Sequence, residues 1–318
     1  MAIGASADAT VRLASWRSLP LVAAVPVDLE PRGVAVDPSA GRIYVGNFLG
    51  DTVSVLDAAT RAVVATIPVG PMPWGIALDP VARKVYVANS GSNTVSVIDA
   101  ASNRAITTVP VGVVPEGIAV NQATGRVYVA GYVDHTLSVL DGATNTVVAT
   151  LPTGIAPSGV AVDPGLNRVY VADYGDNTVA VFDGDTDRRL ALVPVGVGPR
   201  AICADPRAHA VYVVDYGDAA ITVLDGVALR ARATIPVGGY PLAAALDPTT
   251  GRLYVARGTE GLRAGIGGVT VIDGPTATDL LSLPLRGDPA GIGVDPATSR
   301  LYVSDFVGNA VSILQDEP

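Results

Sequence analysis

The chain is poor in cysteine, in aromatic residues and in charged residues. Its 318 residues include 1 Cys, 3 Phe and 2 Trp, and only 16% of them are charged. A single cysteine excludes an intrachain disulfide, and we expect Cys203 to be a small buried thiol. The lack of disulfides is typical of a protein from a reducing compartment, so we expect a cytoplasmic location.

Long apolar and basic runs are also missing. No apolar run reaches the about 18 residues that a membrane-spanning helix requires, and the N-terminal segment lacks the basic start and apolar core of a signal peptide. The formal net charge is −9, and no run of Lys or Arg stands out within it. We therefore expect a monomer whose partners include neither nucleic acid nor membrane.

The motifs of several common enzyme classes do not occur. There is no nucleophile elbow, phosphate-binding loop, Cys-x-x-Cys pair or His-Glu-x-x-His sequence. The glycine-rich stretches lie between predicted strands without a following helix, which argues against nucleotide binding. We expect no cofactor and no bound metal.

One motif repeats along the chain. The dipeptide Asp-Pro, replaced once by Asn-Gln, begins at residues 37, 79, 121, 163, 205, 247 and 295, which gives five spacings of 42 residues and a last one of 48. The repeat from Gly75 to Gly112 contains four short apolar segments, GIAL, KVYVAN, TVSVID and AITTVPV, separated by turn residues. Four short strands at this period are typical of a β-propeller blade.

Seven markers predict an all-β, seven-bladed β-propeller of four-stranded antiparallel blades over residues 21–314. The last repeat has only three strands, whereas the sequence of a fourth strand occurs at Leu21 to Val27. We therefore expect the N-terminal strand to complete the last blade and close the ring, which would hide a sheet edge. Residues 1–20 and 315–318 are predicted to form an N-terminal extension and a C-terminal tail.

The second strand of the repeat carries a tetrapeptide that resembles the Tyr-Val-Thr-Asn signature of the YVTN family of β-propellers. Examples begin at Tyr44, Tyr86, Tyr170 and Tyr302. The resemblance extends from Pro20 to Leu314 and implies the same fold. It implies little about function, because similar propellers include surface proteins, binding proteins and enzymes such as the streptogramin lyases.

Positions that differ between repeats are free to build a site. The clearest one lies just before the Gly or Ala of the first strand, and it holds Arg32, Trp74, Glu116, Ser158, Arg200, Leu242 and Ala290. These side chains are expected to project towards the central opening on one face. They would form either a mixed polar and aromatic pocket or a solvated rim, and Trp74 favours the pocket because an exposed rim has no need of tryptophan.

The loops between second and third strands reach the same face and carry Phe48, Tyr132, Tyr174, Tyr216 and Phe306. This concentration of aromatic residues favours a binding surface, with ordinary packing as the alternative. Tyr240 and Arg257 of the sixth repeat complete the candidate set for substrate binding. The extra residues of that repeat lengthen the loop 257–268, which either contacts a ligand or is a neutral insertion.

Polar residues at the loop starts have two interpretations. Asp173, Asp215 and Asp305 are expected to bind turn amides, and a role as oxygen ligands of a cation is the alternative. His135 stands where sister repeats have Asp or Asn, so it either bonds within its loop or lies near Glu116 for acid–base chemistry. The other histidine, His209, is expected to be solvated at the opposite face.

These residues favour a cytoplasmic protein that binds a small organic molecule at the mouth of its central channel. Glu116, His135 and Tyr132 are candidate catalytic residues for redox-cofactor-independent chemistry of the lyase, cyclase or isomerase kind, in specialised metabolism. Arg32 and Arg200 are expected to hold anionic groups, and Trp74 and the tyrosines to stack on the substrate. The alternative is a non-catalytic scaffold that binds a peptide or protein on the same face.

Overall fold

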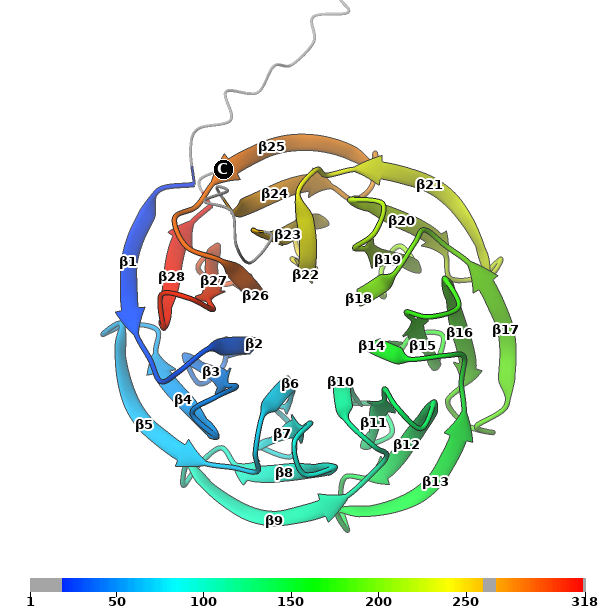
Figure 1. The fold of residues 1–318 in the computed structure, drawn as a ribbon, viewed down its shortest axis with the longest axis horizontal. Coiled ribbons are helices and arrows are strands. Elements are labelled where there is room, and N and C mark those ends of the chain that lie inside the picture. The colour runs from blue at the N-terminus through cyan, green and yellow to red at the C-terminus, as the bar shows by residue number, and fades with distance from the viewer. Residues whose placement is uncertain (1–18, 260–266, 317–318) are drawn as a thin grey trace, which may run out of the picture.

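A computed structural model describes residues 19–259 and 267–316 of the chain. These residues form seven four-stranded antiparallel sheets arranged as blades around a central axis (Figure 1), without any helix in the described ranges. The predicted seven-bladed propeller is therefore confirmed. The described residues contain no helix that could cross a membrane. Two segments for which we made predictions lie outside the described ranges. They are the N-terminal extension before residue 19 and residues 260–266 of the long loop.

The blades follow one another in chain order, and each runs from an inner to an outer strand. Blades one to three contain β2 (Pro31–Asp37), β3 (Arg42–Asn47), β4 (Thr52–Asp57) and β5 (Ala62–Pro68); β6 (Pro73–Asp79), β7 (Lys84–Asn89), β8 (Thr94–Asp99) and β9 (Arg104–Pro110); and β10 (Pro115–Asn121), β11 (Arg126–Gly131), β12 (Thr136–Asp141) and β13 (Thr146–Pro152).

Blades four to six repeat this arrangement. They contain β14 (Pro157–Asp163), β15 (Arg168–Asp173), β16 (Thr178–Asp183) and β17 (Arg189–Pro194); β18 (Pro199–Asp205), β19 (Ala210–Asp215), β20 (Ala220–Asp225) and β21 (Arg230–Pro236); and β22 (Tyr240–Leu246), β23 (Arg252–Gly258), β24 (Gly268–Asp273) and β25 (Thr278–Pro284). Blade seven combines β26 (Pro289–Asp295), β27 (Arg300–Asp305) and β28 (Ala310–Gln315) with β1 (Leu21–Pro26) from the other end of the chain.

The middle strands are buried on both faces because each blade packs between two others. This explains why β3, β7 and β15 are apolar almost throughout instead of alternating. The tyrosine of the repeated tetrapeptide is fully buried in every blade. Tyr170 also links neighbouring blades, because its hydroxyl donates to the carbonyl of Gly226 in blade five at 3.3 Å.

The ring is closed by the N-terminal strand, as predicted. β1 pairs antiparallel with β28, from Leu21 opposite Leu314 to Pro26 opposite Ala310. The Val27 amide adds a hydrogen bond of 2.9 Å to the Asn309 carbonyl. Val25 of β1 is buried in the apolar cluster between blades seven and one, so this strand both covers the edge of β28 and contributes to the core.

Deletion of Leu21 to Val27 is expected to expose the edge of β28 and to cause aggregation and a lower melting temperature, because an unpaired edge strand pairs readily with other chains. Size-exclusion chromatography and a thermal melt measure both effects. In a milder test, Val25→Asp places a charge in the core and Ala24→Asp places one on the exposed side of β1. Equal stability of the two point variants, or a monomeric deletion variant with an unchanged melt, would contradict this role of β1.

Candidate functional site

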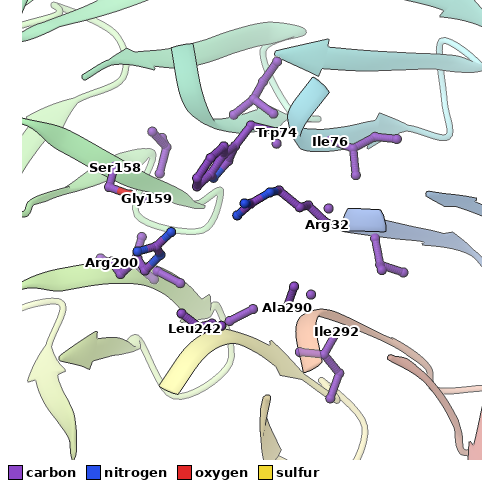
Figure 2. Close-up of a pocket in the computed structure, with 18 residues that line it drawn as sticks. Arg32, Trp74, Ile76, Ser158, Gly159, Arg200, Leu242, Ala290 and Ile292 are labelled. Carbon is purple, nitrogen blue, oxygen red and sulfur yellow. The ribbon is translucent and has the colours of Figure 1, made fainter. Parts of the chain in front are cut away.

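The variable positions of the inner strands surround a cavity of about 220 Å³ at the mouth of the channel (Figure 2). Six of the seven predicted positions line it: Arg32, Trp74, Ser158, Arg200, Leu242 and Ala290. Two residues further along the same strands, the wall is apolar and consists of Val34, Ile76, Ile118, Val160, Ile202 and Ile292. The cavity thus has an upper wall of mixed polar and apolar residues and an apolar lower wall, and the expectation of a pocket rather than a rim fits this geometry.

Arg32 is held in the cavity by aromatic rings rather than by a carboxylate. Its guanidinium carbon lies 4.1 Å from the ring centre of Trp74, 4.4 Å from that of Phe48 and 4.5 Å from that of Phe306. Such cation–π contacts strengthen when water is excluded. Among the described residues no side chain forms an ion pair with Arg32 within 4.0 Å, and its buried Nε atom has no hydrogen-bond partner.

A second guanidinium faces the same space. Arg200 lies 5.5 Å from the ring centre of Trp74 and 5.7 Å from that of Tyr216, and Figure 2 shows its side chain and that of Arg32 extending towards Trp74. Burial, followed by repulsion from Arg200, lowers the pKa of Arg32 to about 10. Arg32 therefore stays charged at neutral pH, and an anion between the two guanidinium groups would relieve their repulsion.

Glu116 is the seventh variable residue, and it does not line the cavity. Its side chain is buried, and its Oε2 accepts a hydrogen bond of 2.7 Å from Ser158 Oγ, which belongs to a cavity-lining residue. Burial raises the pKa of Glu116, while the Ser158 hydrogen bond and the charges of Arg200 and Arg32 act in the opposite direction. Glu116 is thus placed to exchange protons with the cavity through the Ser158 hydroxyl.

The aromatic residues of the loops form pairs around the mouth. Phe48 packs edge to face on Trp74 at 5.5 Å, Tyr216 lies 5.6 Å from Tyr240, and Tyr132 lies 6.4 Å from Tyr174. Burial raises the pKa of Tyr132, and the Glu116 charge raises it further. None of these six residues except Trp74 lines the cavity itself, so the loops form an outer aromatic layer that supports the arginines.

His135, a candidate catalytic residue, forms a hydrogen bond to the backbone of a neighbouring loop. Its Nδ1 accepts a hydrogen bond of 3.1 Å from the Ala156 amide, which belongs to the loop entering the next blade. In sister blades Asn93 accepts from the Val114 amide at 2.9 Å in the same way. His135 is exposed, and no hydrogen bond within the described residues joins it to Glu116.

Two further predicted positions are placed away from the cavity. Arg257 is half-buried at the end of β23 and packs near Gly239 and Gly268. His209 was predicted to be solvated, and its side chain is partly exposed. Its Nδ1 also lies 2.7 Å from Oδ2 of the buried Asp163 in the neighbouring blade. The turn that carries His209 lies against blade four, so its side chain has a protein partner as well as contact with water.

The carboxylates at the loop starts are buried beneath the loops. Asp173 and Asp215 are fully buried, and burial raises their pKa to about 7 and to about 6. Asn47 in blade one donates to both Thr52 and Ser54 at 2.9 Å, whereas Asp173 Oδ1 has no hydrogen-bond partner among the residues that the structure describes. Asp305 accepts hydrogen bonds from the Asp288 and Gly308 amides. No group of three or more potential metal ligands occurs in the part of the chain that the structure describes.

Replacing Asp173 by Asn is expected to stabilise the protein at pH 8 and to have little effect at pH 4. The folded protein keeps the Asp173 proton up to about pH 7, but an unfolded chain loses it near pH 3.8. Stability therefore falls as pH rises from about 4 to 7 and stays low above it, and Asn removes this loss, which is at most about 4 kcal/mol. Thermal melts at both pH values measure it. The exposed Asp185→Asn is the control, and an equal shift at both pH values would contradict the prediction.

Comparison with known proteins identifies the fold. A family model described as NHL repeat matches residues 155–182, in blade four. A chain of Kuenenia stuttgartiensis hydrazine synthase superposes with a TM-score of 0.79 at 20% sequence identity, and the match covers 91% of this chain and 97% of that chain. No curated protein matches the sequence. The chain is a seven-bladed β-propeller that carries an NHL-type repeat, and at this identity the structural likeness shows the fold alone.

Proposed function

We propose that this propeller binds a small organic anion at the mouth of its central channel. The observation that carries the proposal is the pair Arg32 and Arg200, two guanidinium groups on one cavity wall without an ion-pair partner among the described residues. Two cations without an anionic partner in a partly buried site favour the binding of an anionic ligand. Trp74 provides a flat apolar surface beside both of them.

We further propose that the bound anion undergoes redox-cofactor-independent acid–base chemistry of the lyase, cyclase or isomerase kind, in the cytoplasm. As the Ser158 oxygen takes a proton from the ligand, its own hydroxyl proton passes to Glu116 Oε2, so Ser158 stays neutral and Glu116 ends protonated. The hydrogen bond of 2.7 Å supports this relay, since general acid–base transfer requires this range.

Glu116→Gln tests the relay. The amide keeps the shape of the side chain but cannot accept the proton, so turnover of a substrate is expected to fall by about two to four orders of magnitude. The melting temperature should stay within a few degrees of the parent protein, which a thermal melt checks. Asp185→Asn, an exposed acid-to-amide change at the other end of a blade, is the matched control. Full turnover in Glu116→Gln would exclude the relay, because the reaction would then proceed without the Glu116 carboxylate.

Trp74→Ala tests the location of the site. Its removal deprives Arg32 and a bound ligand of an aromatic surface, so the affinity for an organic anion such as phenylacetate is expected to fall at least tenfold. Isothermal titration calorimetry measures the affinity, and Val64→Ala on the exposed outer strand β5 is the control. If Trp74→Ala binds as tightly as the parent protein, the site lies elsewhere.

The alternative function is a scaffold that binds a protein or peptide on the same face. It is favoured by exposed aliphatic side chains in the loops around the mouth: Leu29, Leu49, Val133, Ile155, Val197 and Val307. Exposed apolar side chains gathered on one face favour a protein-binding surface. Leu49→Ser combined with Val307→Ser would weaken binding of a protein partner but leave the affinity for phenylacetate unchanged, because neither change adds a charge, and this separates the two functions.

A further inference from the structure

We infer that the cavity selects organic monoanions with a compact apolar body, and that Glu116 is the residue that disfavours dianions. This inference rests on the proposed function and specifies its ligand class. It follows from the order of polar and apolar groups along the inner strands and from the count of charges in the cavity wall and directly behind it.

The apolar lower wall requires an apolar part of the ligand. Its side chains lie one tier below the arginines, and three of them are Ile76, Ile118 and Ile202. No polar side chain of the described residues contributes to this tier of the cavity lining. The volume of about 220 Å³ is sufficient for a phenyl ring or a short alkyl chain, because a cavity of about 150 Å³ holds benzene. A purely polar anion would leave this wall in contact with water.

The arginines require a negative group at the upper tier. Three aromatic rings surround the Arg32 guanidinium, and its N–H groups are the donors that a ligand would use. A carboxylate accepts hydrogen bonds from such groups in a planar, two-oxygen geometry. Arg200 adds a second cation beside the same Trp74 ring.

Glu116 limits the number of negative charges. Two guanidinium groups oppose one buried carboxylate, so the wall carries a single net positive charge when Glu116 is ionised. Its charge reaches both arginines, since it acts on the pKa of Arg32 and they act on its own. Glu30 and Asp288, in the loops that lead into β2 and β26, also act on Arg32 and add to the repulsion of a second negative group.

Isothermal titration calorimetry with four probes tests the inference: phenylacetate, acetate, benzyl alcohol and phenylsuccinate. Phenylacetate is expected to bind at least tenfold more tightly than each of the other three probes. Acetate lacks the apolar body, benzyl alcohol lacks the charge, and phenylsuccinate carries two charges. Arg200→Gln should weaken phenylacetate binding at least tenfold. Arg104→Gln, the same change on the exposed outer strand β9, should not.

The Glu116→Gln variant gives the sharpest result. It is expected to tighten phenylsuccinate binding at least tenfold while phenylacetate binding changes much less, so that the preference for one charge is lost. Ile118→Thr should weaken phenylacetate but not acetate, which reports on the lower wall. If phenylsuccinate binds the parent protein as tightly as phenylacetate, or if Glu116→Gln leaves the preference intact, the inference is wrong although the proposed function stands. If benzyl alcohol binds as tightly as phenylacetate, the ligand charge is irrelevant and the proposed function is wrong as well. If none of the four probes binds, both are wrong.

Discussion

The fold and the site both depend on the close approach of neighbouring inner strands around the axis. A Cβ atom on Gly33 would lie 2.5 Å from the Trp74 carbonyl oxygen, and one on Gly75 would lie 2.2 Å from that of Glu116. No side chain fits at such distances, so these positions admit only glycine unless the blades move apart. The residue before each of these glycines is the variable one. Interblade packing therefore fixes the backbone of the very residues whose side chains form the cavity.

This arrangement explains how a small charged site stays ordered. The backbone of Trp74 is pressed against Gly33 of the preceding blade, and its ring packs against Phe48 and the Arg32 guanidinium. Arg32 thus needs no carboxylate to hold it in place, which leaves its charge available. A site of this kind is organised before the ligand arrives, so less free energy is lost on binding to ordering its side chains.

The repeat in the sequence was sufficient to predict the fold because every blade obeys the same packing rule. It also predicted the cavity position, since a residue that varies among otherwise similar blades is under no shared structural constraint. Contacts between side chains of different blades could not be predicted from the repeat. Phe48 and Phe306 were predicted to meet the substrate, but they stack on Arg32, and the loop histidine bonds to an amide 21 positions later in the chain.

Blade three shows that a side chain from one repeat position can replace a side chain missing at another. A comparison of equivalent repeat positions cannot reveal this. Gly131 stands where Asn47 or Asp173 fills the space in other blades, which suggests a gap beneath the loop. A Cβ atom at Gly131 would lie 2.2 Å from Asp134 Oδ1, so the side chain of Asp134 occupies the missing volume from a different position. A polar side chain therefore occupies this space in blade three as in the other blades, but it comes from a different position of the repeat. Only the three-dimensional structure shows this.

The overall charge adds a last constraint on the ligand. The chain carries a formal net charge of −9, so an anion approaching from solution meets a surface that repels it on average. This repulsion is screened beyond about 8 Å at physiological ionic strength. Attraction to Arg32 and Arg200 therefore acts only once the ligand has entered the mouth, where burial reduces screening. Recognition must then come from short-range contacts with the two guanidinium groups and the apolar wall, which favours a compact ligand with one charged end.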